Sequence, residues 1–413
     1  MTMTERRDIV IAGGGMVGIS LALELGRLLP AATRITLVEG FTLPPPSSAA
    51  PDYHPSFDAR STALSYSSEL IYRAMGLWPA LQRWLCPIRT IHVSSRGHFG
   101  STLLRAEDYG WQALGHVVEN PWLGQTLLHA LRAQGRVELL NPAKVVAAMA
   151  VSGGFELALE GSAPACLQTA LLVVADGADS GLRQALGVSS SEKPYSQHAL
   201  ICNIATAQPH QGCAFERFTD EGPLALLPLL PAPGSNNRSA LVWTLPPARA
   251  QQLLNCAGDE FLGALQQRFG YRLGRLLQAG ARQAYPLALR HCAEQVRAGV
   301  VIMGNAAHAL HPVAGQGFNL ALRDIAALGQ VLAPAVAAGQ GPGDLAVLQR
   351  YRERQHQDQL RTIHFSDRLP ALFMHPDPLL GLARDLALSG LDWAAPLKRV
   401  FVEHAAGLEA SRG

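Results

Sequence analysis

Residues 8–39 follow an order of strand, glycine loop, helix and strand that few folds accommodate. Residues 8–12 are an apolar run typical of a buried strand, and apolar residues continue at helical spacing over residues 19–29. A second apolar run over residues 34–38 ends on Glu39. A helix that connects two such strands crosses over a parallel sheet, so the segment predicts an α/β fold with a Rossmann-like domain.

Three glycines stand between the first strand and the helix at the spacing of a dinucleotide-binding turn. Gly13 allows a tight turn, Gly15 allows a pyrophosphate to approach the backbone, and Gly18 allows the helix to pack closely on the sheet. Glu39 is placed to bind ribose hydroxyls. The glycines alone are also compatible with an ordinary turn. With both strands and the acidic residue present, they predict a dinucleotide whose adenosine ribose lacks a 2′-phosphate.

A second stretch, residues 300–324, repeats the order of strand, glycine loop and helix. Its loop contains Pro312, Gly315 and Gly317, and helical spacing continues from about Phe318. Such a loop brings backbone N–H groups and the positive end of a helix to one point. The stretch therefore suits a bound electron-rich or anionic group, although an ordinary βα turn remains an alternative reading of it.

Metal and disulfide chemistry are not expected. His308 and His311 are three residues apart, but Pro312 and the glycines place them in or beside a loop, and no carboxylate or cysteine completes a set of ligands. The six cysteines contain no CxxC pair, so the thiols are most simply those of a reduced cytosolic protein.

Residues 171–175 form an apolar run of the kind that becomes a parallel strand buried on both faces. Asp176 follows it directly, at the edge where open α/β sheets bind ligands. For Asp176 and Asp179, capping of the next helix is an alternative or additional role. Short apolar runs between turn residues over residues 187–289 predict a mostly antiparallel sheet.

Together these stretches resemble the single-component FAD-dependent aromatic hydroxylases, in particular the ubiquinone-biosynthesis branch of the 2-polyprenyl-6-methoxyphenol hydroxylase type. The resemblance covers residues 8–332 and fades beyond them. One departure is Asn305, where the wider family has aspartate and where asparagine looks like the ubiquinone branch. The segments that carry the resemblance are Gly13 to Gly18 with Glu39, Asp58-Ala59-Arg60, residues 174–180 with Arg183, and residues 304–324.

The resemblance implies a bound FAD, NAD(P)H as a transient co-substrate, and hydroxylation by O₂ through a flavin C4a-hydroperoxide. Pro312 is expected to line the oxygen side of the flavin, and Gly315, Gln316 and Gly317 to stabilise negative charge at flavin N1 and O2 through their amides. A set of residues is expected to bind FAD: Gly13, Gly15, Gly18, Glu39, Arg60, Gln125, Asp176, Gly304, Asn305, Gly317, Phe318 and Asn319. For Arg60 and Gln125, a surface position without a role is the alternative.

The expected organisation is a Rossmann-like FAD-binding domain in three parts, a mostly antiparallel substrate domain and a helical C-terminal region. The parts of the FAD-binding domain are residues 1–85, 105–186 and 285–340. Residues 86–104 cross to the substrate domain, residues 187–284 form that domain, and residues 341–413 form the C-terminal region.

The composition of the chain argues for some classes of binding partner and against others. A net charge of +2 without any dense basic run argues against nucleic acid, and charged residues make up only 16% of the chain. Residues 224–234 contain no lysine or arginine to hold a carboxylate, which favours a neutral polyprenylated phenol held by apolar area, although core packing explains such a run equally well. No uninterrupted apolar stretch suggests a membrane span.

A lipid-resident substrate implies a cytoplasmic protein that is peripheral to the inner membrane. Other ubiquinone-biosynthesis proteins and a second copy of the chain are further possible partners. Two alternative functions remain open from the sequence: a FAD-dependent dehydrogenase or reductase of a prenyl substrate, and a flavin-bearing scaffold of a quinone-biosynthesis complex. The hydroxylated ring carbon, the preference between NADH and NADPH, the prenyl length, the oligomeric state and the role of the C-terminal tail are not predicted.

Overall fold

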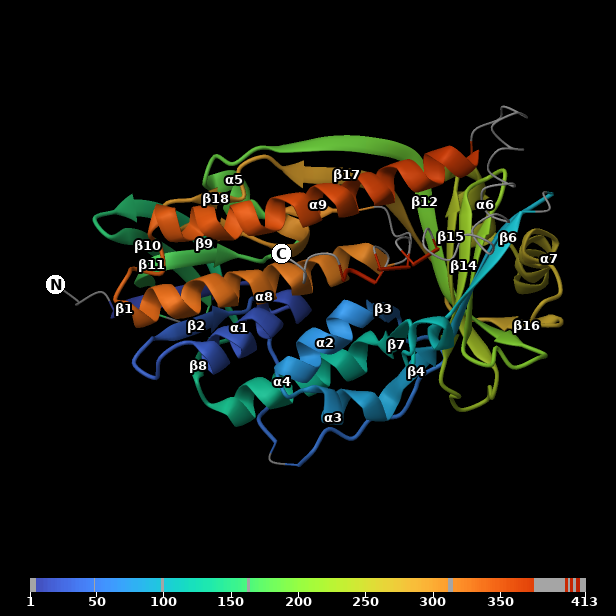
Figure 1. Ribbon diagram of the computed structural model, residues 1–413, viewed down its shortest axis with the longest axis horizontal. Helices are drawn as coiled ribbons and strands as arrows, with labels where there is room; N and C mark the ends of the chain where they lie inside the picture. The colour runs from blue at the N-terminus through green and yellow to red at the C-terminus, as the bar shows by residue number, and fades with distance from the viewer. Residues whose placement is uncertain are drawn as a thin grey trace.

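The computed structural model describes residues 5–47, 49–97, 100–161, 164–310, 315–374, 398–399, 402–403 and 406–408. They form two layered halves joined by a small three-stranded sheet (Figure 1). One half is built on a mainly parallel sheet and the other on a mainly antiparallel sheet. This α/β architecture, with its long C-terminal helix, confirms the predicted fold class.

The mainly parallel sheet has the strand order β18-β19-β11-β1-β2-β8, with β10 and β9 added beside β11 as an antiparallel extension. Strand β1 lies at its centre because Ile9 and Ile11 pack on the helical face, whereas Val10 and Ala12 pack on the opposite face. Its strands are β1 (Glu5–Ala12), β2 (Ile35–Val38), β8 (Val137–Leu140), β9 (Ala143–Val151), β10 (Gly154–Gly161), β11 (Cys166–Val174), β18 (Val296–Arg297) and β19 (Val300–Ile302).

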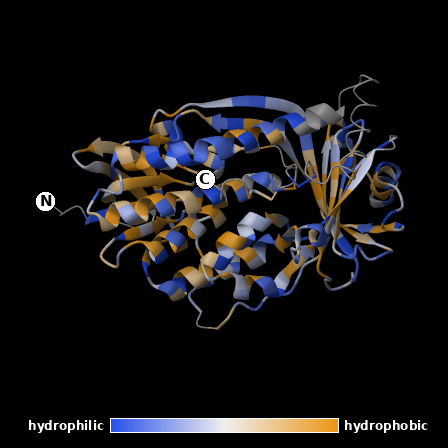
Figure 2. Ribbon diagram, viewed as in Figure 1, coloured by the Kyte–Doolittle hydropathy of each residue, from blue (hydrophilic) through white to orange (hydrophobic). Residues whose placement is uncertain are grey.

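Helices cover one face of this sheet, and the β9–β10 hairpin with a short helix covers the other. The largest hydrophobic cluster lies between the sheet and the helices (Figure 2). The helices of this half are α1 (Met16–Leu28), α2 (Tyr66–Ala74), α3 (Trp78–Leu81), α4 (Asn120–Gln134), α5 (Gly181–Ala185), α8 (Gln316–Ala337) and α9 (Leu345–Met374), with the 3-10 turns η1 (Gln82–Trp84) and η3 (Gly304–Ala306).

The mainly antiparallel sheet has the strand order β20-β17-β12-β15-β14-β13-β5-β6, and β16 pairs with β12. Its outer face is covered by α6 (Pro247–Asn255) and α7 (Gly258–Phe269). The strands are β5 (Thr90–Ser95), β6 (Ser101–Arg105), β12 (Ser190–Thr206), β13 (Cys213–Phe218), β14 (Pro223–Leu229), β15 (Arg238–Leu245), β16 (Leu276–Ala279), β17 (Gln283–Cys292) and β20 (His308–Ala309), and the turn η2 (Ala106–Tyr109) follows β6.

The small sheet between the halves corrects one prediction. The spacing of residues 62–75 predicts a continuous helix that starts just after Arg60. Instead, β3 (Ser61–Ser65) comes first and pairs with β7 (Gly115–Glu119), which also pairs with β4 (Leu85–Ile88). Arg60 therefore lies where a loop enters a strand. A second predicted helix, over residues 251–269, is in fact α6 and α7, interrupted at Cys256 and Ala257.

Among the described helices, α8 alone is long and apolar enough to cross a membrane by length and composition. In the fold it packs between α1 and α9, and 61% of its most apolar window is buried. Its hydrophobicity is therefore that of a core helix. The domain boundaries derived from the sequence stay predictions; β17, which begins at Gln283, is a strand of the antiparallel sheet.

Candidate functional site

The turn between β1 and α1 is built on glycines with two different tasks. A Cβ on Gly18 would lie 1.8 Å from the Gly13 carbonyl oxygen, and a Cβ on Gly13, whose φ is +111°, would lie 2.4 Å from the Ala175 oxygen. These two glycines are required by packing. A Cβ on Gly15 would meet nothing within 4 Å, so the backbone there faces open space.

The first turn of α1 also fits an anion. It contains no acidic residue and has no side-chain cap, so its N–H groups and the positive helix end are directed toward the space beside Gly15. The turn from Gly13 to Gly18, called the cradle below, therefore suits a pyrophosphate.

Glu39 lies directly after β2 and is held in a fixed orientation. The residue is 8% exposed, and its carboxylate accepts hydrogen bonds from the backbone N–H of Gly14 (2.6 Å) and of Phe41 (2.8 Å). Each carboxylate oxygen has a further lone pair. The carboxylate is thereby fixed beside the phosphate cradle with the capacity to accept hydrogen bonds from ribose hydroxyls.

A second helix N-terminus is fixed by Asn319. Gly315, with a φ of +62°, precedes α8, whose first turn has neither an acidic residue nor a side-chain cap. The Asn319 amide donates to the carbonyl oxygens of Ala63 (2.9 Å) and Gly315 (2.8 Å). Its oxygen accepts from Ser65 N–H (2.8 Å) and from the Ser68 hydroxyl (2.7 Å). The side chain of Asn319 is therefore used within the protein and locks the start of α8 to β3 and α2.

The other residues of segment 304–319 that are predicted to contact FAD differ in their exposure to solvent. Gln316 is buried, whereas Gly317 and Phe318 are partly exposed. Gly304 begins the turn η3 with a φ of +62°, and a Cβ there would lie 3.2 Å from Val17 of α1, so this turn closely approaches the phosphate cradle. Asn305 is exposed. Pro312 and His311 lie outside the described residues.

Asp176 and Gln125 are both exposed. Asp176 lies two residues beyond the end of β11, and Gln125 lies on the surface of α4. The capping role left open for Asp176 and Asp179 belongs instead to Ser180, whose hydroxyl accepts from Arg183 N–H at 3.0 Å. Asp179 pairs with Arg290 at 2.6 Å, and this contact holds the pKa of Asp179 below its usual value.

His308 belongs to a buried polar network with no metal set around it. Its Nε2 and an Asp324 carboxylate oxygen are 2.8 Å apart, and both side chains are almost fully buried. The other oxygen of Asp324 accepts from the amides of Gln355 (2.8 Å) and Gln359 (2.9 Å) of α9. No group of three metal-ligating side chains occurs in the described part of the chain. The network ties α9 to the segment that precedes α8.

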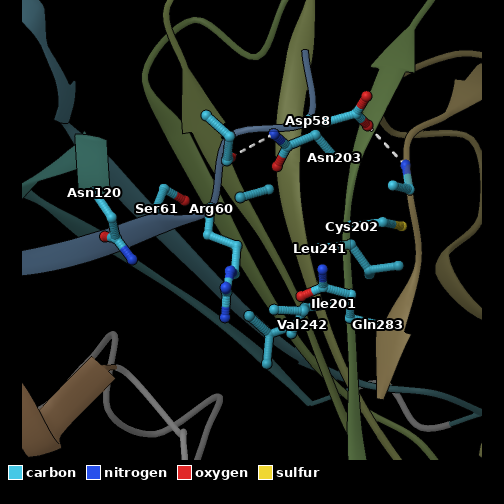
Figure 3. Close-up of a pocket in the computed structure, with 13 residues that line it drawn as sticks. Asp58, Arg60, Ser61, Asn120, Ile201, Cys202, Asn203, Leu241, Val242 and Gln283 are labelled. Atoms are coloured by element: carbon cyan, nitrogen blue, oxygen red, sulfur yellow. Dashed lines mark hydrogen bonds between the residues drawn. The ribbon is translucent and has the colours of Figure 1, made fainter. Parts of the chain in front are cut away.

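A pocket of about 220 Å³ lies where the two halves meet (Figure 3). Arg60 extends into it from the loop, and its guanidinium donates to the Tyr285 hydroxyl (3.0 Å). The sheet side of the pocket contributes no charged side chain. Its lining is Asp58, Ala59, Arg60, Ser61 and Asn120 from the loop before β3, the start of β3 and the start of α4, and Ile201, Cys202, Asn203, Ala240, Leu241, Val242, Ala281 and Gln283 from the antiparallel sheet and the turn before β17.

The loop that carries Arg60 is fixed to the antiparallel sheet by Asn203. The Asn203 amide donates to the carbonyl oxygens of Phe57 (2.7 Å) and Ala59 (2.8 Å), which Figure 3 shows in part. Asp58 accepts from Ala281 N–H (2.7 Å). Sequence reasoning missed Asn203; its one signal is a polar amide within the apolar run of β12.

A buried ion pair reinforces this junction. Arg238 of β15 is fully buried and pairs with Glu119, which is 5% exposed at the end of β7. Arg238 also donates to the carbonyl oxygens of Ser56 and Leu230, both at 2.6 Å, and Tyr53 donates to Glu119. Sequence reasoning missed this pair too, although an arginine that opens an apolar strand indicates a buried partner.

Comparison with known proteins identifies the family. A model of the FAD binding domain matches residues 117–366. The chain is 33% identical to the ubiquinone hydroxylase UbiL of Rhodospirillum rubrum over 97% of this chain and 89% of the relative. It is also 33% identical to the 3-demethoxyubiquinol 3-hydroxylase of Escherichia coli, over 97% and 98%. The chain belongs to the FAD-dependent monooxygenases, in their ubiquinone hydroxylase branch.

Solved structures agree on the fold of this flavin monooxygenase. The p-nitrophenol 4-monooxygenase PnpA of Pseudomonas putida superposes with a TM-score of 0.77 at 18% identity, over 98% of this chain and 99% of that one. Family membership confirms the predicted FAD, with NAD(P)H and O₂ as co-substrates, and selects the monooxygenase over the reductase and the scaffold that the sequence left open.

Proposed function

We propose that this monooxygenase hydroxylates the aromatic ring of a neutral phenol that bears a polyprenyl chain, as a step of ubiquinone biosynthesis. The observation that carries the proposal is the wall of the interdomain pocket. Ile201, Leu241 and Val242 contribute apolar surface, and the sheet side offers no lysine or arginine for a substrate carboxylate. A ligand there is held by apolar area, at about 25 cal/mol per Å² buried.

The cofactor is proposed to extend from the glycine turn to this pocket. The Gly13 to Gly18 turn would hold the pyrophosphate, Glu39 the adenosine ribose, and the start of α8 the electron-rich edge of the flavin. The open space beside Gly15 and the uncapped first turns of α1 and α8 fit such a ligand. When bound, FAD supplies the redox chemistry that accepts a hydride from NAD(P)H and activates O₂.

The protein's own contribution is orientation and the exclusion of water. Arg60, held by Tyr285, would orient the reacting ring system from the loop side, whereas the apolar residues of the sheet would keep water from the reacting face. The Asn319 side chain fixes the start of α8, so the backbone N–H groups there would stabilise negative charge without rearranging.

Localisation follows from the substrate in this proposal. A polyprenylated phenol resides in lipid, so the enzyme is proposed to be cytoplasmic and peripheral to the inner membrane. Contacts with other proteins of the pathway and a homo-oligomer are compatible with this arrangement. The apolar tail proposed to mediate membrane contact, residues 369–401, lies almost wholly outside the residues whose side chains are described.

The proposal is tested with the purified, FAD-loaded protein. Oxidation of NADH and of NADPH is followed with a prenylated phenol and, separately, with 4-hydroxybenzoate, and the products are weighed by mass spectrometry. The expected result is oxidation coupled to a product heavier by one oxygen atom with the prenylated phenol only. Equal or faster turnover of 4-hydroxybenzoate would contradict the assignment of a neutral, prenylated substrate.

A further inference from the structure

One carboxylate, that of Glu216 in β13, lies on the face of the antiparallel sheet that is turned toward the other half of the molecule. In β13, Phe215 packs against Phe269 of α7 on the outer face, with ring centroids 5.4 Å apart. Ala214 packs instead in the cluster that contains Val117 of β7. Because side chains alternate along a strand, Glu216 faces the same side as Ala214.

The register of the sheet connects this residue with the interdomain pocket. Residues that pair directly across neighbouring strands form one continuous row, with one residue from each of the strands β13, β14, β15, β12 and β17. The row is Glu216, Ala225, Val242, Ile201 and Gln283. The last three of these residues line the pocket into which Arg60 extends. Glu216 lies two strands beyond Val242, or roughly 10 Å at the usual strand spacing. An aromatic ring on this surface therefore spans much of the distance between them.

Glu216 has no partner of its own within the described chain. Its carboxylate makes neither a hydrogen bond nor an ion pair there, and its cross-strand neighbours are Val93 and Ala225. Burial among such residues raises the pKa of Glu216 to about 7. Glu216 is still partly exposed on this face, so a ligand that covers it can supply the hydrogen bond that the described residues do not.

Three charged side chains of the described elements around Glu216 are already paired or face away. On the same face of the sheet, Arg238 is bound to Glu119. Arg217, the next residue of β13, faces the opposite side and donates to the Arg268 carbonyl oxygen (2.9 Å). From α9, which also contacts β13, Asp367 is paired with Lys193 (3.0 Å). Glu216 is thus distinguished from its neighbours by lacking a partner.

We propose that Glu216 is a catalytic residue that accepts the hydrogen bond, and then the proton, of the substrate's phenolic hydroxyl. This inference rests on the proposed phenolic substrate. The phenolic O–H bond breaks, the proton passes to the carboxylate, and the electron pair stays on the phenolic oxygen, from which it activates the ring. A ring carbon then bonds to one oxygen atom of O₂ as the O–O bond breaks, and the two electrons from NAD(P)H reduce the other oxygen atom to water. The ring proton that is displaced is released to solvent, and Glu216 returns its own proton to the phenolic oxygen.

The chemistry of the two groups matches this role. A phenol ordinarily has a pKa of about 10, so it is neutral at pH 7 and a much poorer electron donor than its phenolate. A general base is most effective when its pKa lies near the working pH. The apolar surroundings that bring the pKa of Glu216 to that range also suit a prenylated ring.

The test compares Glu216→Gln, which keeps the size and hydrogen-bonding capacity but accepts no proton, with Glu216→Asp, which keeps a carboxyl. The control is Glu260→Gln, which removes an exposed carboxylate from the first turn of α7, on the outer side of the sheet. FAD content and substrate-free reduction by NAD(P)H show that each variant is folded and loaded. The rate of product formation is then measured with a prenylated phenol between pH 5.5 and 10.

For Glu216→Gln we expect product formation to fall on the order of 100-fold at pH 7. The rise in wild-type rate between about pH 6 and 8 should disappear, and the rate should recover as the pH approaches the phenol's own pKa. Glu216→Asp should retain the rise at an intermediate rate, and Glu260→Gln should match the wild type. If Glu216→Gln does not load with FAD, Glu216→Asp decides: loss of the rise in this variant contradicts the proposal.

The outcomes separate the two proposals. A wild-type enzyme that turns over no phenol overturns the proposed function, and the role of Glu216 falls with it. A wild-type enzyme that does turn over the phenol, together with a Glu216→Gln variant within about threefold of its rate and with the same pH profile, overturns the role of Glu216 alone.

Discussion

The cradle of the β1–α1 turn, where we propose that the FAD pyrophosphate binds, and the pocket between the two halves are built by opposite means. The cradle at Gly13 to Gly18 is contiguous in the chain, and its shape comes from main-chain packing that tolerates no Cβ at Gly13 or Gly18. The pocket is assembled from segments far apart, and side chains hold it together: Asn203 reaches a loop 144 residues away, and Arg238 pairs with a residue 119 positions away. One site is specified by local backbone geometry and the other by long-range polar contacts.

Because they are built differently, the two sites should differ in which property a mutation changes. A change in the cradle would alter the space that the proposal gives to a phosphate, whereas a change in the polar contacts would alter how the two halves pack together. Binding of FAD and turnover of substrate should therefore be separable by point mutations.

The strongest test of this comparison is Arg238→Met. It leaves the Glu119 carboxylate buried without its cation, and removal of one partner of a buried ion pair typically destabilises by about 3 to 5 kcal/mol. Urea unfolding should show a loss of this size. The control Arg297→Met breaks an exposed pair with Glu294 and should change stability by no more than about 1 kcal/mol. Equal effects of the two variants would contradict the role given to the buried pair.

Gly18→Ala and Gly15→Val test separately whether a glycine of the cradle is needed for packing or for FAD binding. The first forces a methyl against the Gly13 oxygen, and overpacking of this kind destabilises by about 1 to 3 kcal/mol, with loss of FAD. The second places its side chain in open space, so the fold should remain stable while FAD affinity falls at least tenfold, or about 1.4 kcal/mol. Thermal unfolding of the apoprotein and FAD titration measure the two effects. Full FAD occupancy in Gly15→Val would show that the cofactor lies elsewhere.

Asn203→Ala tests the pocket without touching the cradle. It removes donors to the Phe57 and Ala59 carbonyl oxygens, and an unsatisfied buried group typically costs about 1 to 3 kcal/mol. The loop that presents Arg60 should lose its fixed position, so kcat/KM should decrease while FAD affinity stays close to wild type. A parallel loss of FAD would indicate that the pocket and the cradle are not independent.

Asn305→Asp should have the smallest effect. It adds a negative charge at an exposed position that the proposal places near the FAD phosphates, where water screens the repulsion to about 1 kcal/mol or less. FAD binding should therefore weaken modestly or stay unchanged in a fluorescence titration at low salt. A large gain in affinity would contradict the proposed path of the cofactor.

The sequence predicts the parts of the fold that depend on neighbouring residues better than the parts that depend on long-range contacts. The β1–α1–β2 unit was predictable because strand, glycine loop, helix and acidic residue adjoin in the chain. The strand β3 is missed because the segment 61–65 is short and acquires its conformation by pairing with β7, fifty or more residues away. Helical spacing in the following residues then extended the predicted helix backward.

The polar contacts of the pocket were beyond sequence reasoning for a related reason. The spacing of residues along one chain does not show that Asn203 faces the loop before Arg60, or that Glu119 meets Arg238. Glu216 illustrates the same limit, because only the register of five strands places it in a row with the pocket.

The four hydrogen bonds of Asn319 have a consequence for electron transfer. They fix the start of α8 within the protein, so a change in charge on the flavin that we propose binds there would require little reorganisation of its surroundings. The reduction potential of that flavin would then depend on the integrity of β3. Local opening of that short strand would make the bound group harder to reduce before the protein as a whole unfolds.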